Sequence, residues 1–108
     1  MRYLETLHLA GGRPFVLETR WLNPAVLPAD PPDFAEVSAN EWLVTHVSLV
    51  SGDMSVTAEP ASPREAEVLG VAAGTALLVA ERTTHGTAGP VTLVRLAHAP
   101  GHRVTMTF

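Results

Sequence analysis

Two charged side chains in the segment ETRW are the first candidates for binding chemistry. Glu18 and Arg20 are two residues apart in an alternating stretch, so on a β-strand they project from one face, opposite to Thr19 and Trp21. An arginine guanidinium can bind a carboxylate through two hydrogen bonds, and a glutamate can accept a hydrogen bond from an imidazole N–H. The alternative is a solvated cross-strand ion pair without a ligand. In both cases Arg20 is expected to be an exposed strand residue, so that Arg20→Ala would leave the stability of the free protein nearly unchanged.

Three further residues could contribute to a site. Trp42, in the segment NEWL, is expected on a short helix, where it either anchors the core or covers a flat ligand. Thr92 and Arg95 fall on a later strand, three residues apart, so they point to opposite faces and at most one of them faces a pocket. The Thr92 hydroxyl could hydrogen-bond a neutral ligand atom, whereas Arg95 is equally well explained as a surface or dimer-contact residue.

The histidines do not form a metal-binding pattern. His98 and His102 have the i, i+4 spacing that suits a helix, but Pro100 and Gly101 between them predict a turn. The chain has no cysteine and no Ser-His-Asp, phosphate-loop or dinucleotide-binding pattern. We therefore expect no metal, no other cofactor and no catalytic residues.

Composition limits the classes of protein to which the chain could belong. With 108 residues, of which 46% are hydrophobic, it is expected to form a single domain over residues 1–108. The formal net charge is −4 and the seven Lys and Arg residues are scattered, which argues against direct nucleic-acid binding. No apolar run approaches the length of a signal peptide core or the about 20 residues of a membrane span, and a cytoplasmic location is expected.

The first half of the sequence predicts a hairpin and a helix. The segments YLETLHLA and RPFVLETRWL alternate on either side of Gly11 and Gly12, which is typical of an antiparallel hairpin. The proline-rich segment NPAVLPADPPD can hold at most one helical turn. Ser38, with Glu41 three residues later, forms a capping-box pattern that predicts a helix over residues 39–47.

The second half predicts one helix and several strands. The segment MSVTAE alternates as a half-buried strand with one dry face. Ser62 and Glu65 form a second capping box, which starts the helix SPREAEVLG that Gly70 ends. The segments TALLVAERTTHG, GPVTLVRLAHA and HRVTMTF predict three further strands, so the fold class is α+β, an antiparallel sheet with flanking short helices.

The two hairpins match at an offset of 76 residues. The matched pairs are Pro14 with Pro90, Glu5 with Glu81, Leu17 with Leu93 and Pro24 with Pro100. A capped helix precedes the second hairpin, but nothing before Tyr3 has that part in the first, so the chain is expected to begin inside a repeat unit. The absent helix should leave apolar surface open, and an isologous partner could cover it in a homodimer. The alternative is chance, because any two hairpins share turn and β-branched residues.

The order of these motifs resembles the UTRA effector-binding domain of GntR-type bacterial transcription regulators. ETRWLNP, NEWL and the VT of the later hairpin carry a narrower resemblance to the histidine-utilisation branch (HutC subfamily), and the similarity runs from Leu7 to Phe108. The resemblance implies a chorismate lyase-like fold, a dimer, and a ligand between sheet and helices, with urocanate as the effector of that branch. The winged-helix DNA-binding domain and the first strand and helix of the effector domain have no counterpart here, so DNA would be bound only through that absent domain.

Three functions remain open at this point. The first is a small-molecule sensor, in which Glu18 and Arg20 face the space under the SANEWL helix and bind urocanate or another small acid, with Trp42, Thr92 and Arg95 as further ligand-binding candidates. The second is a stand-alone dimerisation or interaction module. The third is a chorismate lyase-like enzyme, which the fold alone does not exclude, although no residue set offers a poised acid or base.

Overall fold

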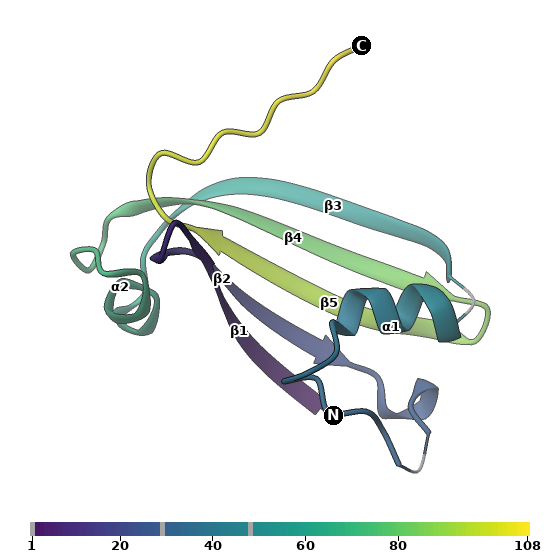
Figure 1. The fold of residues 1–108 in the computed structure, drawn as a ribbon. Helices are drawn as coiled ribbons and strands as arrows, with labels where there is room; N and C mark the ends of the chain where they lie inside the picture. The colour runs from purple at the N-terminus through teal and green to yellow at the C-terminus, as the bar shows by residue number, and fades with distance from the viewer. Residues whose placement is uncertain (1, 29, 48) are drawn as a thin grey trace.

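Five antiparallel strands form one sheet in the order β1-β2-β5-β4-β3 (Figure 1). The computed structural model describes residues 2–28, 30–47 and 49–108. The strands are β1 (Arg2–Ala10), β2 (Arg13–Leu22), β3 (Leu49–Pro60), β4 (Ala76–Gly86) and β5 (Gly89–His98), and the helices are α1 (Ala39–His46), α2 (Pro63–Leu69) and a 3-10 turn at Pro24–Val26. The predicted fold class, an antiparallel sheet with flanking short helices, is confirmed.

Both predicted helices begin at their serine caps. Ser62 accepts a hydrogen bond from the backbone N–H of Glu65, and the Glu65 carboxylate accepts one from the backbone N–H of Ser62, which completes the capping box of α2. Gly70 ends α2 in the left-handed region, with φ of 71°. The cap of α1 is one-sided, because Ser38 accepts from the backbone N–H of Glu41 at 3.4 Å and no return bond is present among the described contacts.

The two helices cover opposite faces of the sheet, at its two ends (Figure 1). Leu22 of β2 packs with Leu43 of α1 and with Val91, whereas Leu17 of β2 packs with Leu69 of α2. Leu17 and Leu22 are five residues apart on one strand, so they project from opposite faces. We call these faces the α1 face and the α2 face, and each has its own small apolar core.

The sequence repeat is present in the backbone pairing. Leu4 pairs with Arg20 in the first hairpin, and Ala80 pairs with Leu96, 76 residues later, in the second. Both hairpins have a register shift at the same place, between His8 and Leu9 and between Thr84 and His85. β2 and β5 pair with each other at the centre of the sheet, so the two hairpins are related by an internal pseudo-two-fold axis. Chance similarity does not explain matching registers and matching bulges.

Strand β3 is more exposed than its alternating sequence predicts. It was expected to have one dry face, but all its residues with a described side chain are exposed except Glu59, which is half-buried. β3 is an edge strand, paired only with β4, and both helices pack elsewhere. The alternating sequence therefore predicts the strand correctly, but the prediction of one dry face is wrong because none of the described elements packs on this edge strand.

The prediction of a last strand in HRVTMTF is wrong. Residues 102–108 have no strand pairing and run away from the sheet (Figure 1). Val104, Met106 and Phe108 are exposed, with Met106 at 75%. An alternating segment becomes a strand only where a neighbouring strand supplies hydrogen-bonding groups, and β5 already has a partner on each side.

Candidate ligand-binding site

A cavity of about 220 Å³ lies on the α1 face, between the first hairpin and the segment that leads into α1. Strands β1 and β2 form its floor, and residues 34–40 form its roof. Its lining consists of Leu4, Thr6, His8, Glu18, Arg20, Phe34, Ala35, Glu36, Val37, Ser38, Ala39 and Asn40. Glu18 and Arg20 thus both line a space under the start of α1.

The guanidinium of Arg20 is the buried charge of this cavity. Arg20 is only 2% exposed, so the expectation of an exposed strand residue is wrong. Its Nε donates to Glu18 Oε2 at 3.2 Å, and its Nη1 donates to Thr92 Oγ1 at 3.3 Å. Burial lowers the pKa of Arg20 from its usual value, although the ion pair with Glu18 acts in the opposite direction.

Thr92 fixes the orientation of this arginine. Its hydroxyl accepts from Arg20 and donates to the backbone carbonyl of Trp21 at 2.8 Å, so both of its hydrogen-bonding functions are used. The other terminal nitrogen of Arg20, Nη2, makes no hydrogen bond to the described residues. Arg20 is therefore held on one side and retains donor capacity on the other.

His8 joins the pair and was not identified from the sequence. Its Nε2 lies 3.2 Å from Glu18 Oε1, so Glu18 bridges an imidazole and a guanidinium. The signal was the hairpin register, because a turn at Gly11 and Gly12 places His8 and Glu18 on the same face of neighbouring strands. Phe34 and Glu36 of the cavity roof had no such signal, since their position depends on the path of a proline-rich loop.

Trp42 does not line this cavity. Its ring packs edge-on against Phe34, with centroids 6.1 Å apart, and stacks on His46 at 4.6 Å. It also packs on the core around Leu22 and Leu43. This is the position of a core anchor, one of the two alternatives for Trp42, and Trp42 reaches the cavity only through Phe34.

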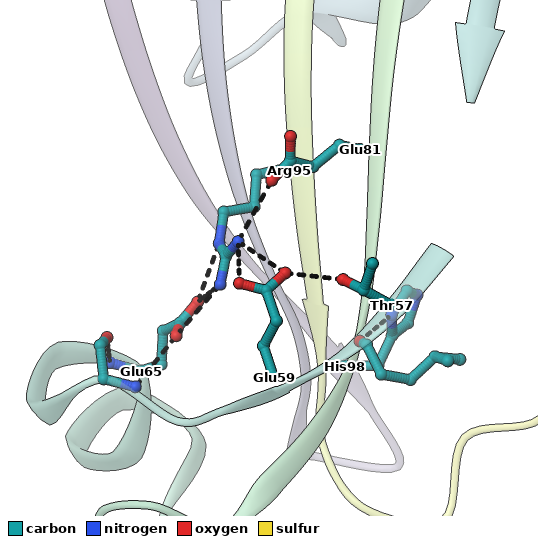
Figure 2. A network of polar contacts seen from close by, with 8 residues as sticks. Thr57, Glu59, Glu65, Glu81, Arg95 and His98 are labelled. Carbon is teal, nitrogen blue, oxygen red and sulfur yellow. Dashed lines mark hydrogen bonds and ion pairs between the residues drawn. The ribbon is translucent and has the colours of Figure 1, made fainter. Parts of the chain in front are cut away.

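Arg95 lies on the α2 face, away from Arg20. It binds three carboxylates at once: those of Glu59 at 3.2 Å, Glu65 at 3.2 Å and Glu81 at 3.4 Å (Figure 2). Although burial acts against the charged form, the hydrogen bonds to Glu59 and the charge of Glu65 raise the pKa of Arg95. The structure thus brings Glu18, Arg20 and Thr92 together and places Trp42 and Arg95 elsewhere.

The paired histidines make an aromatic contact. The rings of His98 and His102 stack with centroids 4.0 Å apart, and the Nδ1 of His98 lies 2.9 Å from the carbonyl oxygen of Leu78. Within residues 2–28, 30–47 and 49–108, no three His, Cys, Asp or Glu side chains gather as a metal site would require. In the same residues, no helix is long and apolar enough to cross a membrane.

The chain thus combines an antiparallel sheet, short flanking helices and a small polar cavity under the start of α1. The model of the UTRA domain family matches residues 2–105, and the chain belongs to this family. The chain is 33% identical over 98 residues to the histidine utilization repressor of Pseudomonas putida, a match that covers 90% of this chain and 39% of the repressor. It thus spans about two fifths of the length of this curated relative.

Solved structures share the fold. The C-terminal domain of the histidine utilization repressor from Pseudomonas syringae is 29% identical and superposes with a TM-score of 0.89, over 98% of this chain and 77% of that chain. A GntR-family transcriptional regulator from Enterococcus faecalis, at 18% identity, superposes with a TM-score of 0.81 over 98% of this chain and 78% of that chain. The fold is therefore the chorismate lyase-like fold of GntR-family C-terminal domains, and the relatives are transcription regulators rather than enzymes.

Proposed function

We propose that this chain is the effector-sensing domain of a GntR-type regulator of the HutC subfamily, and that the cavity under α1 binds a small carboxylate such as urocanate. The observation that carries the proposal is the buried guanidinium of Arg20, which Glu18 and Thr92 hold from one side while Nη2 has no partner among the described residues. A buried arginine with free donor capacity is suited to a carboxylate.

The chemistry of the cavity also indicates the other end of the ligand. Glu18 accepts from both His8 and Arg20, so a ligand carboxylate that engages Arg20 would leave Glu18 able to accept from an imidazole N–H of the ligand. Arg20 is the one arginine or lysine among the lining residues, and Glu18 and Glu36 oppose additional negative charge. A phosphate dianion is therefore a poorer match than a monocarboxylate.

The roof of the cavity connects ligand binding to the rest of a regulator. Residues 34–40 run directly into α1, so a bound ligand would favour one position of this segment and of the helix behind it. In the proposed regulator, a separate winged-helix domain contacts DNA, and the net charge of −4 leads us to expect no specific duplex binding by this chain alone.

Calorimetry and thermal unfolding with urocanate test the proposed site. Ligand at roughly 100 dissociation constants should raise the unfolding free energy by about 2.7 kcal/mol, because binding stabilises only the folded state. Glu18→Gln replaces the carboxylate acceptor with an amide of similar size, and Arg20→Lys replaces the two-pronged guanidinium donor with an ammonium group. Each substitution should weaken urocanate binding at least about tenfold. Arg13→Lys, at the exposed start of β2 beside the hairpin turn, is the matched control.

Two results would contradict the proposal. One is the absence of binding by urocanate and by other small carboxylates. The other is binding to Glu18→Gln and Arg20→Lys with the affinity of the unsubstituted chain. If a sugar phosphate binds more tightly than urocanate, the proposal that the ligand is a small carboxylate is wrong. The cavity is then still the binding site only if Glu18→Gln and Arg20→Lys both lose the sugar phosphate.

We also infer that two copies of the chain pair through β3. This edge strand is 12 residues long and exposed along its length, and its outer backbone groups have no partner among the described residues. Met54 and Val56 are exposed and apolar, and both project from the α1 face of the strand. A second β3, running antiparallel, would extend the sheet across a two-fold axis.

A further inference from the structure

Arg82 of β4 is a second arginine on the α1 face. It pairs with Val94 of β5, and Val94 pairs with Arg20 of β2, so the three residues form one row across the sheet. Residues paired in this way project from the same face of an antiparallel sheet. The Cα atoms of Arg82 and Arg20 are therefore two strand spacings, about 10 Å, apart. The side chain of Val94, which is fully buried, lies between them.

The side chain of Arg82 reaches the wall of the cavity under α1. Its Nη2 donates to Oδ1 of Asn40 at 3.3 Å. Asn40 is the second residue of α1 and lines that cavity, whereas Arg82 does not line it. The guanidinium of Arg82 therefore stands directly behind Asn40, and it ties the first turn of α1 to the sheet.

The positive charge of Arg82 is not neutralised by a neighbouring carboxylate. Within the described residues Arg82 makes no ion pair, whereas Arg20 is paired with Glu18. Burial is the main cause of the lowered pKa of Arg20, and the charge of Arg82 contributes to it. The two guanidinium groups thus repel each other, and a negative charge placed near both would be attracted by both.

This arrangement distinguishes anionic from neutral ligands. The ion pair of Arg20 and Glu18 has no net charge by itself and gives little preference for an anion. Arg82 adds one positive charge behind the wall, which attracts a carboxylate bound at Arg20 but not a neutral group of the same shape. Because Val94 is buried between the two arginines, this attraction is screened less than one between two surface charges.

We propose that Arg82 is a specificity-determining residue of the cavity under α1, and that its charge, held behind Asn40, selects anionic over neutral ligands. This inference rests on the proposed function of the cavity as the ligand site. Arg82 acts through space and through Asn40, so it is a positioning residue and does not contact the ligand itself.

Two substitutions of Arg82 separate its charge from its hydrogen bond. Arg82→Gln removes the charge but keeps a donor for Asn40, and it should weaken urocanate binding about fivefold at about 0.05 M NaCl. At about 0.5 M NaCl the loss should fall below about twofold, because salt screens the charge. Arg82→Lys, which keeps the charge, should bind urocanate with nearly the affinity of the unsubstituted chain. Arg103→Gln removes the same charge from an exposed position and is the matched control.

The carboxamide of urocanate isolates the ligand charge. This neutral molecule should bind the unsubstituted chain and Arg82→Gln with equal affinity. A loss of urocanate affinity that is the same at both salt concentrations, or that Arg82→Lys shares, would show a structural role and overturn the proposal. So would an equal loss for urocanate and its carboxamide.

Acetate tests Arg82 without the larger ligand. At about 0.1 M, and relative to the same concentration of NaCl, acetate should raise the thermal midpoint of the unsubstituted chain more than that of Arg82→Gln. If urocanate and other small carboxylates of its size do not bind, the proposed function fails, and the acetate comparison still decides the role of Arg82. Equal acetate shifts in the two chains would overturn that role.

Discussion

Arg20 has two roles in the structure. It lines the candidate ligand site, and its guanidinium is also buried as part of the fold. Its guanidinium bridges Glu18 and Thr92, which lie on neighbouring strands β2 and β5. A ligand-binding variant at this position therefore also changes folding. This is the reason that the binding test uses Arg20→Lys and not a truncation.

We predict that Arg20→Ala lowers the unfolding free energy by about 3 kcal/mol, because it leaves the Glu18 carboxylate and the Thr92 hydroxyl without their buried partner. Urea unfolding measures this loss. Arg13→Ala, at the exposed start of β2, should change the unfolding free energy by less than about 0.5 kcal/mol. Equal effects of the two substitutions would show that the Arg20 contacts do not support the fold.

His102 should make stability depend on pH. Burial, and then the neighbouring His98, lowers the pKa of His102 from 6.5. The unfolded chain therefore binds a proton on His102 at a higher pH than the folded chain does. The contribution of this residue to the unfolding free energy is complete above pH 6.5 and is lost as the pH falls through the lowered pKa of the folded state. Unfolding free energies between about pH 7.5 and about pH 5.5 should decrease more in the unsubstituted chain than in His102→Gln. Parallel pH profiles would contradict this.

At the scale of elements, the two serine caps differ in completeness. Ser62 and Glu65 exchange hydrogen bonds with each other's backbone N–H at 3.1 Å, whereas Ser38 makes one longer bond at 3.4 Å. α2 packs on the larger apolar core, and its Arg64 donates to Glu5 of β1. More tertiary contacts therefore depend on the start of α2 than on the start of α1.

We expect Ser62→Ala to lower the unfolding free energy by about 1 kcal/mol, the usual cost of losing an N-cap side chain. Ser38→Ala should cost less, because only one bond is lost and α1 begins after a loop. Thermal unfolding of the two variants, side by side, gives the comparison. A cost at Ser38 equal to that at Ser62 would mean that the reciprocal bond from Glu65 adds nothing.

At the scale of the molecule, the pseudo-two-fold arrangement leaves the two halves of the sheet unequal. The second hairpin has α2 on one face and β3 beside it, whereas β1 of the first hairpin forms an edge of the sheet. Most of the exposed large apolar residues lie on the two edge strands β1 and β3 and along residues 104–108.

The proposed pairing through β3 predicts a dimer in sedimentation velocity at micromolar concentration. Met54→Lys with Val56→Lys should give a monomer, because lysines on an edge strand oppose pairing with a second edge. Leu93→Lys, on the central strand β5, should leave the dimer intact. A monomer in the unsubstituted chain, or a dimer that tolerates both lysines on β3, would count against this interface.

Local signals were sufficient for much of this fold. Gly11 and Gly12 predicted the hairpin turn, Ser62 and Gly70 bounded α2, and the 76-residue offset predicted two matched hairpins, all of which the structure contains. Turns, caps and strand alternation depend on residues that are neighbours in sequence, so their physical causes are visible there. The common face of Glu18 and Arg20 followed from the same two-residue period.

Only the tertiary structure decided which surfaces are covered. Placing β2 and β5 side by side brought Thr92 to Arg20 and buried a guanidinium that strand periodicity would leave in solvent. Placing β3 at the edge exposed an alternating strand, and residues 102–108 found no pairing partner among the described strands. Burial and pairing depend on which distant segment supplies the neighbour, and a short sequence pattern specifies only the side on which that neighbour must lie.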